Sequence, residues 1–163
     1  MSLAHAVLTS LLEKPSSGYD LARRFDKSIG YFWHATHQQI YRELARMESA
    51  GWIESSIPAD AGKTRKKEYR VLAAGRKELA RWAEQSSPPM DLRDEFMVKL
   101  RADAVLTEVD LRPELARHLA LHEAQLAVYR DIARRDFPSP ATLDRAQAIR
   151  HAILRRGIVY EEG

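Results

Sequence analysis

The chain has 163 residues, of which 45% are hydrophobic and 30% charged, a composition typical of a globular protein with enough length for a core. It contains no cysteine, which excludes disulfides, thiolate catalysis and zinc sites with cysteine ligands. The sequence has no run of about 18 apolar residues and no charged-then-apolar leader, so we expect a cytoplasmic protein with no membrane partner.

The formal net charge is only +3, but it is unevenly distributed. Residues 1–86 hold 14 Lys and Arg against 10 Asp and Glu, whereas residues 87–163 hold 12 against 13. Residues 63–70 alone hold five basic side chains and one acidic one. This local excess predicts a docking surface rather than a generally basic coat.

The first 51 residues predict three short helices. Residues 3–13 form the first, which ends before a proline. Ser17 and Asp20 fit a capping box that opens a second helix, and Thr36 and Gln39 fit another that opens a third. A tight turn between the last two is typical of a helix-turn-helix. The inner stripe of the third helix is Ile40, Leu44 and Met47.

A β-hairpin is expected next. Residues 52–57 and 68–72 alternate with a period of about two and flank a polar stretch that suits the tip of the hairpin. Helical spacing returns over residues 73–85, and Ser86-Ser-Pro-Pro89 then breaks the pattern. We therefore place a domain boundary between residues 86 and 87.

The C-terminal half predicts helices that pack along one another. Apolar and aromatic positions recur there in steps of four and three, a period of 3.5 residues that is typical of a helix–helix seam. The seam is the expected dimer interface, and it contains Leu115, Leu119, His122, Leu126, Tyr129 and Ala133. The fold class is therefore mostly α with a small β-hairpin: an N-terminal winged helix-turn-helix and a C-terminal helical dimerisation domain.

The third helix carries polar side chains opposite its apolar stripe. A helix in the major groove of DNA presents such groups to base edges, because glutamine can bond adenine and arginine can bond guanine or phosphate. Any solvated helix shows similar residues outward, but the basic hairpin that follows favours DNA binding. The outward residues are His37, Gln38, Tyr41 and Arg42.

In five segments the chain resembles the PadR-type transcriptional regulators, over residues 3 to about 84. The matching segments are Ser17-Gly-Tyr-Asp-Leu21, Trp33 with Gln39-Ile-Tyr-Arg-Glu-Leu44, Met47-Glu-Ser-Ala-Gly-Trp-Ile53, Arg65-Lys-Lys-Glu-Tyr-Arg70 and Gly75-Arg-Lys-Glu-Leu79. The resemblance implies a dimeric winged-helix repressor that binds a double-stranded DNA operator and that a small-molecule effector or a stress signal often releases. Gln38 and Ala35 depart from the glycine and proline common in the family, so base preference cannot be carried over.

The resemblance also implies which residues face DNA. It adds Tyr19 and the wing to the outward face of the third helix. Together with the residues read from the sequence, the expected DNA-binding set is Tyr19, Thr36, His37, Gln38, Gln39, Tyr41, Arg42, Lys63, Arg65, Lys66 and Lys67.

The aromatic side chains and two histidines admit further interpretations. Phe32, Trp33 and Phe96 are candidates for lining an effector pocket, with core packing as the alternative. His118 and His122, spaced i, i+4, suit one metal ion, but no third ligand is evident, so we expect neither metal nor cofactor. No catalytic motif is present, and we expect no enzyme. The alternative function is a helical ligand- or metal-binding protein whose basic hairpin contacts a partner protein.

Overall fold

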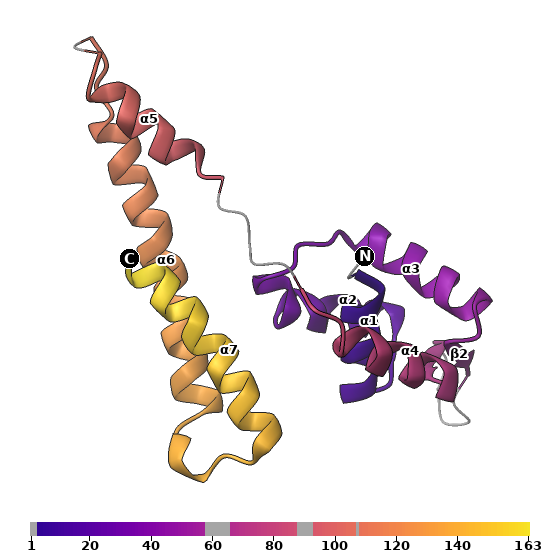
Figure 1. Cartoon of the computed structure of the whole chain (residues 1–163). Helices are drawn as coiled ribbons and strands as arrows, with labels where there is room; N and C mark the ends of the chain where they lie inside the picture. Colours follow the sequence, from indigo (N-terminus) through magenta and orange to yellow (C-terminus); the bar gives the residue numbers. More distant parts are fainter. Residues whose placement is uncertain (1–2, 58–65, 88–92, 107) are drawn as a thin grey trace. The chain divides into compact units, whose positions relative to one another are not determined.

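The computed structural model describes residues 3–57, 66–87, 93–106 and 108–163. The chain divides into two compact units, Met1–Pro89 and Met90–Gly163 (Figure 1). The described residues are mostly helical with one small sheet, as the sequence predicts. None of the helices among the described residues is long and apolar enough to cross a membrane.

Three helices and a hairpin build the core of the first unit. Their inward apolar side chains are almost completely buried, including the predicted stripe of the third helix. The three helices are α1 (Leu3–Glu13), α2 (Gly18–Asp26) and α3 (His37–Ser49). α4 (Ala73–Ala83) packs against α1, and a short 3₁₀ turn, η1 (Ile29–Tyr31), follows α2.

The sheet has three strands, one more than the sequence predicts. The predicted hairpin is present as β2 (Ile53–Ser56) and β3 (Glu68–Val71), which pair antiparallel. The extra strand β1 (Ser16–Ser17) pairs with the other edge of β3, so the strand order is β1-β3-β2. Two residues carry no alternation, so this strand could not be found from periodicity.

Arg24 of α2 fixes the segment that contains β1. Its Nη2 donates to the carbonyl oxygens of Ser10 at 2.7 Å and Lys14 at 2.8 Å, and its Nη1 donates to Ser16 Oγ at 2.5 Å. The Ser10 and Lys14 carbonyls thereby gain a charged donor beyond the bonds that they accept from the Lys14 amide and the Ser16 hydroxyl. One arginine thus ties α1, α2 and the edge of the wing sheet together.

The two predicted capping boxes differ. At α3, Thr36 Oγ1 accepts from the Gln39 amide at 3.2 Å and Gln39 Oε1 accepts from the Thr36 amide at 2.8 Å, which confirms the box. At α2, Ser17 Oγ caps the Asp20 amide, but it also donates to Asp20 Oδ2 at 2.6 Å. The predicted box is therefore only half formed at α2, because the Asp20 carboxylate accepts from the Ser17 hydroxyl.

α4 packs on α1 through His5. The His5 ring stacks on Trp82, with centroids 4.4 Å apart, and its Nε2 lies 3.2 Å from Glu78 Oε1. Gly75 of α4 leaves space for the Trp52 carbonyl oxygen, which would lie only 2.3 Å from a β-carbon there. Trp52 and Trp82 are thus packing residues.

The second unit consists of helices. They are α5 (Glu95–Asp103), α6 (Arg112–Asp136) and α7 (Arg145–Glu162), with a 3₁₀ turn η3 (Pro140–Thr142) before α7. α6 is the longest, and α7 returns along it while α5 lies beside its first turns (Figure 1). Asp94 caps α5 and Asp144 forms a capping box at α7.

Candidate nucleic-acid interface

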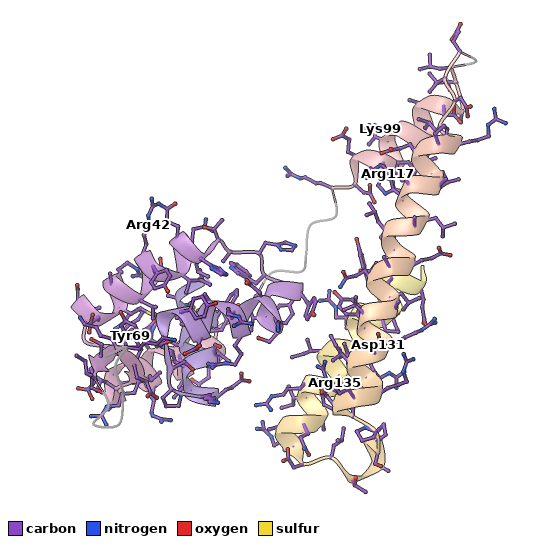
Figure 2. All side chains as sticks on the ribbon, turned by 180° about the vertical axis from the view of Figure 1, so that it is seen from behind. Arg42, Tyr69, Lys99, Arg117, Asp131 and Arg135 are labelled. Carbon is purple, nitrogen blue, oxygen red and sulfur yellow. The ribbon has the colours of Figure 1, made fainter. Side chains whose placement is uncertain are left out.

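The outward face of α3 is exposed over its first two turns. Ile40, Leu44 and Met47 are at most 1% exposed, and the polar residues between them point away from this core. Figure 2 shows Arg42 directed outward from the first unit. The exposed residues of this face are His37, Gln38, Gln39, Tyr41 and Arg42.

The two arginines of α3 differ in what they contact. Arg46 binds Glu43 at 2.7 Å, and its guanidinium lies 5.6 Å from the centroid of the Trp52 ring. For Arg42 no ion pair is found within the part of the chain that the structure describes. Arg42 is therefore the α3 arginine that keeps its donors available for a ligand.

Thr36 and Gln39 use part of their hydrogen-bonding capacity on each other. The threonine hydroxyl and the glutamine carbonyl oxygen both serve the capping box. Each residue was predicted to face DNA, but these atoms hold the start of α3 in place. What Gln39 keeps for a ligand is its amide nitrogen.

His37 is held by an acidic residue that the sequence did not identify. Its Nε2 lies 2.8 Å from Oδ2 of Asp26, the last residue of α2. The two side chains are about half exposed. They come from the two helices on either side of the turn, so only the tertiary structure brings them together.

Tyr19 lies between two cations near the start of α2. The Arg23 guanidinium is 5.6 Å from the centroid of its ring, and Lys66 Nζ is 5.4 Å from it. The hydrogen bond from Ser17, and then the charges of Lys66 and Arg23, lower the pKa of Asp20 from its usual value. Arg23 was missed from the sequence, although its i, i+4 spacing from Tyr19 was the available signal.

Tyr41 connects the outward face of α3 with the start of α2. A β-carbon at Gly18 would lie 2.5 Å from Cε1 of Tyr41, so the ring covers this glycine. The ring remains 45% exposed. The start of α2, the first turns of α3 and the base of β3 therefore form one continuous surface, which we call the α2–α3–wing face: Ser17, Tyr19, Arg23, Gln38, Tyr41, Arg42 and Lys66.

The described part of the wing contains two of its predicted cations. Lys66 and Lys67 are exposed immediately before β3. Lys63 and Arg65 lie outside the described residues. Further along β3, Arg70 pairs with Glu54 across the strands at 2.5 Å, so its charge is compensated.

The predicted seam on α6 is divided between two uses. Tyr129 is 7% exposed and packs against Gly157 of α7, and His122 Nδ1 lies 2.5 Å from Glu161. Leu115 and Leu119, by contrast, are 51% and 58% exposed. The prediction that one seam faces a second copy therefore needs correction for Tyr129, because α7 of the same chain already covers it. Leu126 is half-buried.

The two histidines of α6 have different partners. His118 stacks on Phe96 with centroids 4.0 Å apart and lies 3.3 Å from Glu114, whereas His122 pairs with Glu161. A hydrogen bond from Arg117 lowers the pKa of Glu114 to about 2. Among residues 3–57, 66–87, 93–106 and 108–163, no group of three metal-ligating side chains comes together.

The three predicted effector-pocket residues fall in both units. Phe32 and Trp33 belong to the first unit and are exposed, whereas Phe96 belongs to the second and is stacked on His118. The three residues therefore belong to two separate compact units.

Two family models cover most of the chain. Residues 7–81 match the "Transcriptional regulator PadR-like family", and residues 92–163 match "Virulence activator alpha C-term". The probable transcriptional regulator Rv1176c of Mycobacterium tuberculosis is 43% identical over 99% of this chain and 91% of its own length.

Solved structures are similar over nearly the whole chain. The virulence activator AphA of Vibrio cholerae has a TM-score of 0.79 at 34% identity, covering 99% of this chain and 90% of that one. PadR of Bacillus subtilis in complex with operator DNA has a TM-score of 0.85 at 26% identity, covering 99% and 91%. Its complex with p-coumaric acid has a TM-score of 0.80 at 25% identity, with 99% and 91% covered.

The same Bacillus subtilis protein is described as a negative transcriptional regulator and is 32% identical over 77% of this chain and 69% of its own length. The winged-helix fold, the matched family models and the identity to these regulators agree. The chain belongs to the PadR-like family of transcriptional regulators, whose members are not enzymes.

Proposed function

We propose that this protein is a homodimeric repressor that binds a pseudo-palindromic DNA operator and is released by a small-molecule effector. Residues 1–86 form the DNA-binding domain and residues 87–163 the dimerisation domain. The observation that carries the proposal is the α2–α3–wing face, on which exposed polar groups of α3 adjoin Lys66 and Arg23.

The face offers two kinds of contact. Gln38 and Arg42 have the donors and acceptors that read base edges in the major groove. Lys66, Lys67 and Arg23 suit phosphates, which position a protein without selecting sequence. The distribution of side chains on one exposed surface thus matches the division of labour in a winged helix on DNA.

Dimerisation is supported by apolar surface that the protomer leaves uncovered. Leu115 and Leu119 of α6, with Ile149 and Ile153 of α7, are each between 46% and 58% exposed. Apolar side chains spaced by three and four residues on a helix suit packing against another helix. A two-fold dimer would present two α3 helices to half-sites about 34 Å apart, or a multiple of that distance.

Repression and effector release are proposed from the relatives. Bacillus subtilis PadR is a negative regulator and has been solved with operator DNA and with p-coumaric acid. AphA is a virulence activator. A reporter gene under the promoter of the regulator's own gene distinguishes repression from activation, because repression predicts higher expression after deletion of the regulator.

DNA binding is tested by the salt dependence of affinity. If each protomer makes about three phosphate contacts, the logarithm of the affinity should fall with the logarithm of salt with a slope of about −5. Lys66→Ala with Arg23→Ala should weaken binding to all duplexes alike and flatten the slope. Arg76→Ala with Lys77→Ala on α4 is the matched control, because it removes two exposed charges elsewhere in the unit.

An unchanged slope in the double variant would remove these cations from the interface. Absence of any salt-sensitive, sequence-specific binding to the upstream region of the gene would instead favour the alternative in which the basic hairpin contacts a partner protein.

A further inference from the structure

The Asp26–His37 pair lies on the edge of the α2–α3–wing face. His37 is the first residue of α3, and its Nε2 is 2.8 Å from Asp26 Oδ2. The two side chains are 49% and 50% exposed. The pair is thus accessible to a ligand that approaches the start of α3.

The carboxylate determines which ring nitrogen carries the proton. An ionised carboxylate only accepts hydrogen bonds, so Nε2 must be the protonated nitrogen of the neutral ring. The other nitrogen, Nδ1, is then a bare acceptor. When the ring gains a second proton, Nδ1 becomes a donor and the imidazole carries a positive charge.

We propose that Asp26 is a positioning residue that sets the hydrogen bond His37 offers to DNA: an acceptor when the ring is neutral and a donor when it is protonated. This inference rests on the proposed DNA-binding function. Phosphate oxygens and the major-groove edge of guanine are acceptors, so they match only the protonated form.

The net charge of the pair also favours DNA binding by the protonated form. Asp26 with neutral His37 carries a net charge of −1 and repels phosphates, whereas the protonated pair is neutral. Asp26 is the charged side chain that contacts the ring from α2. Arg23 and Lys27 flank Asp26 at the end of α2. Tyr41 and Arg42 follow His37 on α3, and His34 precedes that helix. Loss of the second ring proton should therefore lower DNA affinity.

The test measures affinity at two pH values and constant ionic strength. The probe is a duplex that the protein itself selects from a random-sequence pool, followed by fluorescence anisotropy. Wild-type protein should bind about tenfold more tightly at about pH 6 than at about pH 8, because each of two protomers gains one exposed charge. Calorimetry in buffers of different ionisation enthalpy should detect proton uptake on binding.

Three variants separate the pair from other titrations. His37→Gln still donates to Asp26 but cannot take a proton, so the affinity ratio should approach one and proton uptake should fall. Asp26→Asn removes the negative charge and lets Nδ1 carry the proton of the neutral ring, so affinity at about pH 8 should rise toward the value at about pH 6. His34→Gln, an exposed histidine of the same unit, should keep the wild-type ratio.

The inference is overturned if His37→Gln keeps the wild-type ratio or if Asp26→Asn binds more weakly at about pH 8. Both results leave DNA binding itself intact. Failure of wild-type protein to bind any selected duplex at either pH would overturn the proposed function, and this inference with it.

Discussion

The ring of Tyr129 on α6 lies against Gly157 on α7, where a β-carbon would be 3.0 Å from Cε2 of the tyrosine. This contact lets the two helices approach closely and buries a ring that the 3.5-residue pattern assigned to a dimer interface. Because Gly157 has no β-carbon, α7 can cover the Tyr129 ring within one protomer.

Gly157→Val should destabilise the second unit. The branched side chain cannot fit beside the Tyr129 ring without moving it, and overpacking of this kind costs about 1–3 kcal/mol. Helix propensity acts in the opposite direction at this position, because valine is a better helix former than glycine, so a loss of stability reports the contact itself. A free energy of unfolding, measured by urea titration, that equals or exceeds that of the wild-type protein would show that the contact is loose.

Glu78 should make the first unit sensitive to acid. The hydrogen bond from Arg81, and then that from His5, lower the pKa of Glu78 from 4.5 to about 2. Because the pKa is lower in the folded state, the ionised carboxylate stabilises the fold above about pH 4.5. This contribution is lost as pH falls toward about 2.

Glu78→Gln removes this contribution. Wild-type protein should exceed the variant in stability at about pH 5, and the difference should shrink at about pH 3. Glu84→Gln, at the exposed end of α4, controls for the loss of one carboxylate. A difference that stays constant over this range would mean that the ion pair is not formed in solution.

Gln38 and Arg42 should govern base preference. Both side chains are exposed on the outer face of α3. Among the residues that the structure describes, neither is held by a local ion pair, as Arg46 is by Glu43. Gln38→Ala or Arg42→Ala should change the preference at particular base pairs by about 1–3 kcal/mol. Selection from a random pool measures it, and Arg46→Ala is the matched control on the same helix. Uniform weakening on all sequences would instead assign these residues to phosphates.

Leu115→Asp with Leu119→Asp should give a monomer. Both side chains are more than half exposed in the protomer, so the charges should disrupt a partner's packing and leave the protomer folded. Leu121→Asp is the control, because it places a charge on another side of α6, where the leucine is 55% exposed, and this variant should remain dimeric. Light scattering distinguishes the two states, and a double variant that remains dimeric would place the interface elsewhere.

The sequence by itself was sufficient for the helices of the first unit, for the hairpin and for the family. Capping residues act within four positions, and helical and strand periodicity act within a few turns, so both can be read from a local segment. The limits of α1, the capping box of α3 and the hairpin of β2 and β3 were predicted for this reason. The five motif segments likewise depend only on order and spacing.

What depended on the tertiary structure are contacts between segments far apart in the chain. β1 forms because one edge of β3 is free to pair with it. Arg24 of α2 stabilises β1 there by donating hydrogen bonds to Ser16 and to Ser10 of α1. Asp26 meets His37 only after the turn between α2 and α3 has formed. The periodicity of α6 showed that one side of the helix is apolar. It could not show whether α7 or a second copy covers that side. Periodicity indicates only that the apolar side must pack against something, whereas the identity of the packing partner depends on the tertiary structure.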